Sequence, residues 1–270
     1  MSKKEREFVP LKEMWKKKEF SKKNLVVPLG RSLGNKDLFI NISKLPHLLI
    51  TGTTGSGKSN FLHCLINSFA HKLSPAELKL ILVDPKRVEL LLYNGLPHLL
   101  SEVIVDSAKA VSALRWLARE MERRYKSLEE MGLPDIEKYN EKSKEKMPYI
   151  LYIVDEFADI FYSQKKSFEN AVIPILQMGR AVGCHVILST SKPTKDIMRG
   201  MITANILSRL SFNLSCASDS KEVLFKTGAE KLLREGDALY EGIDDVVPIR
   251  LQTPYISEEE IKKQIKLAFN

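Results

Sequence analysis

The sequence has few of the residues that build disulfide frameworks and metal centres. Its three cysteines, Cys64, Cys184 and Cys216, are far apart with no Cys-x-x-Cys pair, and its five histidines have no metal-ligand spacing. An odd number of dispersed cysteines is typical of a reducing compartment. We therefore predict a cytoplasmic protein without a disulfide framework, and we interpret the histidines as structural or surface residues.

Long apolar runs are also missing. No run approaches the roughly 18 residues that a membrane helix needs. The first 20 residues are basic but lack an apolar core, so they do not resemble a signal peptide. With 270 residues, 44% hydrophobic and 28% charged, the chain has enough apolar side chains for a large core in one domain or two. We expect no membrane segment in this chain, although a longer parent protein could be tethered to a membrane.

The positive charge is unevenly distributed. The formal net charge is +8, and residues 1–23 hold eight Lys and one Arg against four Glu, which accounts for +5 and leaves +3 for the rest. A basic segment can contact nucleic acid or an acidic membrane surface, and a solvated amphipathic helix fits equally well. We predict a basic lead-in over 1–23 and one main domain over 24–270, so any DNA-binding prediction must depend on local features.

Short apolar runs alternate with helical patterns after the lead-in. Helices are predicted at 58–72 and 107–131, with a surface connection at 132–148 and a tail helix capped by Ser257 and Glu260. Continuous apolar runs are typical of strands buried on both faces. The predicted strands are 24–29, 47–52, 78–84, 149–155 and 185–190. The fold class is therefore α/β, a mainly parallel sheet flanked by helices, with a β-rich C-terminal extension past residue 205.

A glycine-rich loop follows the second predicted strand. Residues 52–59, GTTGSGKS, match G-x4-G-K-[ST] between a strand and a helix, the context that the P-loop motif requires. Its backbone N–H groups and the helix N-terminus bind phosphates, Lys58 reaches the β- and γ-phosphates, and the Ser59 hydroxyl ligates Mg²⁺. The predicted ATP-binding residues are Gly52, Thr53, Thr54, Gly55, Ser56, Gly57, Lys58, Ser59 and Asn60. The predicted cofactors are ATP and Mg²⁺.

An acidic pair follows the strand at 149–155. Asp155 is predicted to hold the Mg²⁺ shell and Glu156 to deprotonate the attacking water, since ligands bind at the carboxyl ends of parallel strands. Alone, such an acid could simply cap the next helix. Together with the P-loop it favours ATP hydrolysis over nucleotide binding alone.

Motifs outside the nucleotide loop occur in a characteristic order. They are LILVDPKRVELLLYNGLPHLL, ALRWLAREMERRY, YNEK, PYILYIVDEFAD, GRAVGCHVILSTSKP and GAEKLLREGDALY. With PHLLITGTTGSGKS they resemble the motor of the FtsK/SpoIIIE family, from about residue 24 to the end. The resemblance implies a RecA-like P-loop NTPase fold, a ring that is commonly a hexamer, and ATP-driven translocation of double-stranded DNA. The biological setting would be chromosome or plasmid segregation, or conjugative transfer.

The resemblance also implies roles for residues beyond the P-loop. Arg180 matches an arginine that the family presents to the ATP of a neighbouring subunit, with Arg209 as the second choice. An arginine paired with a surface carboxylate would give the same pattern. Asp84-Pro85-Lys86 matches the family's DPK motif, near the site or the subunit contact, although a tight turn is an equal alternative. Thr190 and Ser191 occupy the sensor positions, where the family usually has Thr-Gln, so the shorter Ser191 leaves the γ-phosphate sensor in doubt.

The predicted DNA contacts are basic residues near these motifs. They are Lys192, Lys195 and Arg199, with Lys165 and Lys166 on a loop after Asp155-Glu156. Where the family tends to have basic residues, this chain has Thr203 and Ala217. A backbone grip on duplex DNA needs only such charges, and solvated surface lysines would look the same. The stretch 192–203 lacks aromatics, which favours duplex, whereas FYSQKKSF (161–168) interleaves them and leaves single-stranded DNA open.

Three functions remain open on the sequence alone. We favour an ATP-driven DNA translocase that forms a ring. A protein-export ATPase is the second, since type VII secretion motors share this fold and loop. A scaffold that binds ATP without hydrolysing it is the third, suggested by Ser191 and opposed by an intact Lys58, Ser59, Asp155 and Glu156. The family's membrane helices, linker and winged-helix module are not recognisable, so we expect either part of a longer protein or a compact relative from a plasmid or conjugative element.

Overall fold

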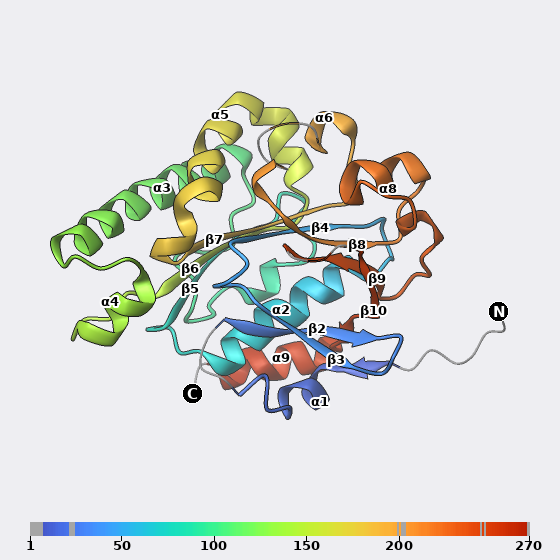
Figure 1. Cartoon of the computed structure of the whole chain (residues 1–270), viewed down its shortest axis with the longest axis horizontal. Helices are drawn as coiled ribbons and strands as arrows, with labels where there is room; N and C mark the ends of the chain where they lie inside the picture. The colour runs from blue at the N-terminus through green and yellow to red at the C-terminus, as the bar shows by residue number, and fades with distance from the viewer. Residues whose placement is uncertain are drawn as a thin grey trace.

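The described residues form a nine-stranded sheet with helices on both faces (Figure 1). The computed structural model describes residues 8–21, 25–198, 200, 204–243, 245 and 247–268. The strand order is β3-β2-β10-β9-β8-β4-β7-β6-β5. A separate pair of short parallel strands, β1 (Val9–Pro10) and β11 (Pro254–Tyr255), lies beside it.

The central strands are parallel. They are β4 (His47–Thr51), β5 (Leu78–Val83), β6 (Tyr149–Val154), β7 (Cys184–Thr190) and β8 (Ser208–Phe212). β4 lies between β7 and β8, and all residues of these three strands are buried. A strand covered by helices on both faces is mostly apolar, which explains the continuous runs in β4 and β7, whereas β8 includes Ser208, Arg209 and Ser211. The predicted α/β class with a parallel core is confirmed.

The remaining strands extend this sheet in antiparallel fashion. They are β2 (Val26–Ser32), β3 (Asp37–Asn41), β9 (Asp237–Glu241) and β10 (Ile249–Gln252). β9 pairs with β8, β10 joins β9 to β2, and β3 forms the outer edge. The β-like pieces past residue 205 are therefore a continuation of the main sheet, and the predicted first strand pairs antiparallel within it.

Helices cover the two faces of the sheet in two layers (Figure 1). One layer contains α3 (Ser107–Glu130), α5 (Phe157–Met178), α6 (Lys195–Met198) and α8 (Ala217–Leu224). The other contains α1 (Leu11–Trp15), α2 (Lys58–Lys72) and α9 (Glu258–Leu267). Short 3-10 turns are η1 (Leu91–Tyr93), η2 (Gly179–Val182) and η3 (Ala229–Lys231). Each layer encloses its own apolar cluster against the sheet. Within the described residues, no helix combines the length and hydropathy needed to cross a membrane.

Local signals account for most helix boundaries. The helices predicted at 58–72 and 107–131 are α2 and α3, and Ser257 and Glu260 form the predicted capping box of α9. The prediction of a plain connection at 132–148 is wrong in part. It contains α4 (Ile136–Lys142), because the Asp135 carboxylate accepts the Lys138 backbone N–H and caps a two-turn helix.

The described part of the lead-in packs on the domain. Leu11, Met14 and Phe20 are buried, and the Trp15 indole donates to the Ser68 hydroxyl of α2 at 2.9 Å. The Trp15 ring also stacks on His71, with centroids 4.2 Å apart. These contacts anchor residues 8–20 to the α2 layer, and the division of the chain at residue 23 stays a prediction.

Candidate nucleotide site

The carboxyl ends of the parallel strands open into a cavity of about 620 Å³. The P-loop forms one wall and the Asp155-Glu156 pair another. The third wall comes from the C-terminal part of the chain, residues 235–236 and 253–255, with Phe8 beside it. This is the edge where ligands bind in open α/β sheets.

Glycine conformation shapes the P-loop. Gly57 precedes α2 with φ 112°, and a Cβ there would lie 2.5 Å from the Gly236 backbone nitrogen. The Gly236 N–H donates to the Ser56 carbonyl at 2.8 Å, so the two loops touch through their backbones. On α2, the Asn60 amide donates to the Ile256 carbonyl at 2.7 Å. Larger residues at Gly57 would separate the P-loop from this third wall.

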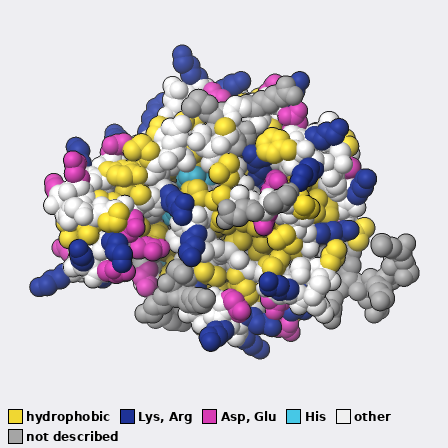
Figure 2. Space-filling model, in the orientation of Figure 1, with side chains coloured by type: hydrophobic (Ala, Val, Ile, Leu, Met, Phe, Trp, Pro, Cys, Tyr) yellow, Lys and Arg dark blue, Asp and Glu magenta, His cyan; other side chains and the backbone are white. Residues whose placement is uncertain are grey.

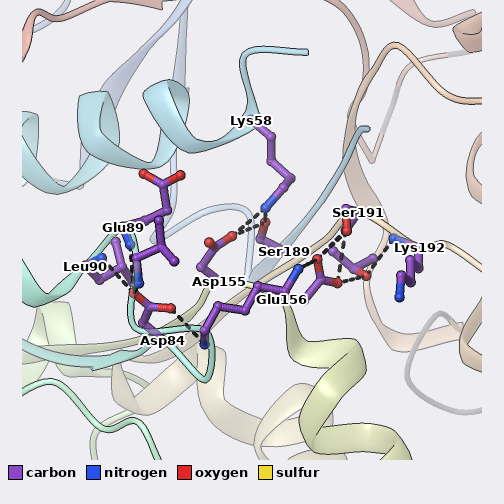
Figure 3. Close-up of polar contacts among 12 residues, drawn as sticks. Lys58, Asp84, Glu89, Leu90, Asp155, Glu156, Ser189, Ser191 and Lys192 are labelled. Atoms are coloured by element: carbon purple, nitrogen blue, oxygen red, sulfur yellow. Dashed lines mark hydrogen bonds and ion pairs between the residues drawn. The ribbon is translucent and has the colours of Figure 1, made fainter. Parts of the chain in front are cut away.

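Lys58 and Asp155 meet at the base of the cavity (Figure 3). The Lys58 ammonium forms an ion pair with the Asp155 carboxylate and donates to the Ser189 hydroxyl at 3.0 Å. Ser189 in turn donates to Asp155 at 3.3 Å. Lys58 and Asp155 are only 7% and 4% exposed, so each charge depends on the other for compensation. Asp155 and Ser59 line the same cavity, which fits a Mg²⁺ ion held by a carboxylate and a hydroxyl.

Glu156 begins α5 in a left-handed conformation, with φ 64° and ψ 61°. Thr190 donates to its Oε1 at 2.5 Å, the Ser191 hydroxyl and backbone N–H donate as well, and Lys86 donates to Oε2 at 2.9 Å. Burial would raise the pKa of Glu156, but these donors outweigh it and lower the pKa to about 2. A non-glycine residue in this backbone region is strained, and the ring of donors holds it there.

The two sensor positions therefore contact Glu156 (Figure 3). Thr190 Oγ1 also accepts the Lys192 backbone N–H at 3.1 Å, which links the acidic residue to the start of the 192–198 segment. Ser191 lines the cavity despite its short side chain. Whether Ser191 senses a γ-phosphate stays a prediction.

Asp84 organises the segment that follows β5. It is fully buried, and its carboxylate accepts the backbone N–H groups of Lys86, Val88, Glu89 and Leu90 at 2.9–3.1 Å. The segment is thereby folded back so that Lys86 and Glu89 both line the cavity. The DPK motif is a tight turn whose Lys86 also lines the cavity, and its place at a subunit contact stays a prediction.

Sequence reasoning did not assign several residues of the cavity. They are Phe8, Val88, Glu89, Ser189, Glu235, Gly236, Thr253, Pro254 and Tyr255. Gly236 lies within GAEKLLREGDALY, a motif that was recognised but given no role. Val88, Glu89, Ser189 and Glu235 likewise lie within recognised motifs and were given no role of their own. Phe8, Thr253, Pro254 and Tyr255 lie outside those motifs, and no local pattern marks them.

Arg180 is exposed on η2, at the amino edge of the parallel strands, which is the edge opposite the nucleotide cavity. It lines a second cavity of about 480 Å³ together with Tyr149, which begins β6. Since β6 has six residues, about 17 Å of strand separates this edge from Asp155. Arg180 therefore does not reach the nucleotide cavity of its own chain.

The position of Arg209 does not fit its suggested role as the alternative arginine that contacts the ATP of a neighbouring subunit. It is 4% exposed on β8, donates to the Ile206 and Val223 carbonyls at 3.2 and 2.8 Å, and stacks on the Phe225 ring. Its guanidinium is used inside the fold, in packing against α8.

The predicted DNA contacts that the structure describes lie on two segments. Lys165 and Lys166 are exposed on α5, so their predicted loop is wrong, while Lys192 is exposed ahead of α6 and Lys195 is exposed at its start. The Tyr162 hydroxyl lies 2.7 Å from the Thr194 Oγ1, joining the two segments. Figure 2 shows Lys and Arg side chains at the top of the view, over α5 and α6. Arg199 and Thr203 lie outside the described residues.

Comparison with known proteins shows which family the chain resembles. The model of the FtsK/SpoIIIE family matches residues 10–195. Proteins described as DNA translocase FtsK are 44% identical over 255 residues in Leptospira interrogans and 39% identical over 285 residues in Haemophilus influenzae. These alignments cover 92% and 95% of this chain. The chain spans 27% of the first relative and 54% of the second.

Solved structures with the same fold include two nucleotide-binding proteins of other systems. The pCW3 conjugation coupling protein TcpA, with ATPγS, superimposes with a TM-score of 0.84 at 24% identity over 98% of this chain and 75% of that one. EssC from Geobacillus thermodenitrificans, ATPases 2 and 3, gives 0.84 at 21% identity over 99% and 52%. At this identity the likeness concerns the fold. From the family match, together with the intact P-loop and acidic pair, the chain belongs to the FtsK/SpoIIIE family of P-loop ATPases.

Proposed function

We propose that this chain is an ATP-driven motor that moves double-stranded DNA through a ring of identical subunits. The observation that carries the proposal is the direct connection between the nucleotide site and the lysine cluster, defined as Lys165, Lys166, Lys192 and Lys195. Thr190 bonds Glu156 and the Lys192 backbone, and Ser191 bonds Glu156. A change in the position of Glu156 during ATP turnover would therefore be transmitted through Thr190 to the backbone of Lys192, a proposed DNA contact.

The cavity residues support the chemistry of ATP hydrolysis. The P-loop amides and Lys58 would bind the phosphates, while Ser59 and Asp155 would hold Mg²⁺, which neutralises phosphate charge when bound. Glu156 is the base that would accept a proton from water once some of its present donors release it. The Phe8 and Tyr255 rings, 5.3 Å apart, are 55% and 44% exposed. Both line the cavity, and they offer an apolar face for the base of the nucleotide.

The aromatics of 161–168 favour duplex over single-stranded DNA. Phe161 and Phe168 are buried at 2% and 0% exposure, so only Tyr162, at 56%, could stack on a base. Single-strand binders use several exposed rings in succession. Exposed lysines without such a row fit a grip on the phosphates of a duplex.

The position of Arg180 supports a ring. An exposed arginine at the edge opposite the nucleotide cavity can stabilise transition-state charge only on a nucleotide bound to another copy. Head-to-tail packing of subunits, the arrangement that closes into rings, brings opposite edges together. Arg180 would then complete the site of the next subunit.

The test is the ATPase rate without DNA, with duplex and with single-stranded DNA, at low and high salt. We expect a several-fold stimulation by duplex that weakens with salt, and its loss in Lys192→Ala/Lys195→Ala. The matched control, Lys263→Ala/Lys266→Ala, removes the same charge from α9 on the other helix layer and should keep the stimulation. Stronger stimulation by single strands would reverse the choice of track. Equal rates with and without DNA would overturn the DNA motor and favour export or a scaffold.

A further inference from the structure

A polar stripe runs along α2 behind the P-loop. Ser59, His63 and Asn67 are spaced four residues apart, so they share one face of the helix. That face meets Glu89 and Tyr93, which are also four residues apart, on the segment that Asp84 folds back. Most of this contact is closed to water, since His63, Asn67 and Tyr93 are 7%, 2% and 1% exposed.

Two hydrogen bonds and one ion-pair contact connect these side chains in a single series. The Asn67 amide donates to the Tyr93 hydroxyl at 2.8 Å, and that hydroxyl lies 2.9 Å from His63 Nδ1. His63 Nε2 lies 3.5 Å from the Glu89 carboxylate. Ser59, one turn before His63 on α2, lines the same cavity as Glu89, and His63 and Ser59 both lower the pKa of that carboxylate. Figure 3 shows the Glu89 carboxylate pointing toward α2.

The series has a consistent direction. Because the Asn67 amide is a donor, the Tyr93 hydroxyl accepts it and has its own proton left for His63 Nδ1. With Nδ1 facing Tyr93, His63 presents Nε2 to the Glu89 carboxylate. Glu89 ends the series beside Ser59, which lines the same cavity. A carboxylate at this position can accept the proton of the Ser59 hydroxyl.

Orientation of the Ser59 hydroxyl matters for metal binding. A hydroxyl ligates Mg²⁺ through an oxygen lone pair, so its proton must point elsewhere and is best placed on an acceptor. Glu89, at the rim of the cavity, is placed to be that acceptor. Residues behind a metal ligand typically change metal affinity about 10- to 100-fold when removed.

We propose that Glu89 is a positioning residue that turns the Ser59 hydroxyl toward the metal of bound Mg–nucleotide, supported from behind by His63, Tyr93 and Asn67. The inference depends on the nucleotide half of the proposed function and is independent of DNA. It also gives the segment 84–93 a role, since the Asp84 turn sets the position of Glu89.

The experiment measures how much Mg²⁺ strengthens nucleotide binding. Fluorescent ADP is titrated into the parent chain and into Glu89→Gln, with Mg²⁺ and with EDTA, and the ratio of the two dissociation constants is compared. We expect Glu89→Gln to lower this ratio about tenfold, with the affinity in EDTA unchanged. Glu89→Asp, which keeps the charged carboxylate on a shorter side chain, should recover part of it. Glu102→Gln, an exposed change outside the 84–93 segment, should leave the ratio unchanged.

A second variant tests the support behind Glu89. Tyr93→Phe removes only the hydroxyl from the series and should lower the ratio about two- to fivefold, less than Glu89→Gln. A ratio in Glu89→Gln equal to that of the parent would overturn the proposal. Equal weakening with Mg²⁺ and with EDTA would also overturn it, because Glu89 would then hold the P-loop and not the metal. No ADP binding by the parent chain would instead overturn the nucleotide half of the proposed function.

Discussion

Buried ionisable groups at the two edges of the parallel strands differ in their charge at pH 7. At the carboxyl edge, Glu156 is held charged, with its pKa lowered to about 2 by donors that outweigh its burial. At the amino edge, burial lowers the pKa of His47 to about 3 and of His185 to about 4, so both are neutral at pH 7. His185, whose ring centroid lies 6.4 Å from that of His47, also lowers the pKa of His47.

The difference lies in the number of partners and not in burial. Glu156 accepts from three side chains and a backbone amide, whereas each histidine has one protein partner at Nδ1. His47 Nδ1 accepts from the Val186 N–H at 3.0 Å, and His185 Nδ1 lies 2.9 Å from the Pro46 carbonyl. A buried group stays charged only where enough partners replace water. The carboxyl edge therefore keeps a buried charge, and the amino edge is suited to packing, with Arg180 exposed beside it.

The largest expected effect would connect the two edges. Arg180→Ala should lower the ATPase rate about 10³-fold or more if Arg180 serves a neighbouring site. Arg119→Ala, an exposed change on α3, is the matched control. Mixing Arg180→Ala with inactive Lys58→Ala subunits should restore part of the rate, because one subunit supplies the P-loop and the other the arginine. No recovery on mixing would contradict a role in trans.

Removing the charge at the carboxyl edge should be the next largest effect. Glu156→Gln should lower turnover about 10²- to 10⁴-fold while ADP binding persists, since an amide cannot accept the proton from water. Glu169→Gln, later on the same helix, should have no such effect. Unchanged turnover in Glu156→Gln would refute the assignment of the base.

Acid should weaken the fold mainly through the amino edge. In the unfolded chain the histidines take protons below about pH 6.5, whereas folded His47 and His185 do so only near 3 and 4. Their contribution is thus complete above pH 6.5 and falls by about 1.4 kcal/mol per pH unit for each histidine below it. Urea unfolding at pH 7.5, 6 and 5 should show this slope. His47→Asn, which keeps an acceptor for Val186, should reduce the slope of unfolding free energy against pH by the contribution of one histidine. An unchanged slope would contradict the lowered pKa of His47.

The smallest expected effect concerns one donor at the carboxyl edge. Ser191→Ala removes a hydrogen bond that lowers the pKa of Glu156, so the pKa should rise while Thr190 and Lys86 remain. The acid limb of the pH–rate profile should move to higher pH, and the rate at pH 7 should change only a few-fold. Ser112→Ala, at an exposed position of α3, is the control and should leave the pH–rate profile unchanged. A profile that does not move would mean that Ser191 has no influence on the titration of Glu156.

Patterns within a few residues were readable from the sequence. The strands, the P-loop, α2, α3 and the α9 capping box each depend on local order, and all are present. The helix at 165–166 was missed because SQKKS looks like a loop. Phe161 and Phe168, seven residues apart and both buried, mark the helical face that a longer window would have found.

Contacts between distant segments were not readable. Gly236 and Thr253 complete the cavity only because β9 and β10 extend the sheet beside β8. The series from Asn67 to Glu89 needs the fold-back of the 84–93 segment by Asp84, whose four amide partners leave no pattern in the sequence.

The backbone contact between Gly57 and Gly236 has a consequence for biosynthesis. The P-loop is translated about 180 residues before the loop that completes its cavity, and Ile256, the hydrogen-bond partner of Asn60, is translated later still. A nascent chain that has formed β4 and α2 therefore lacks a wall of the nucleotide cavity. Nucleotide stabilises only states that bind it, so ATP in the cell would favour the folded chain only after translation has passed residue 256.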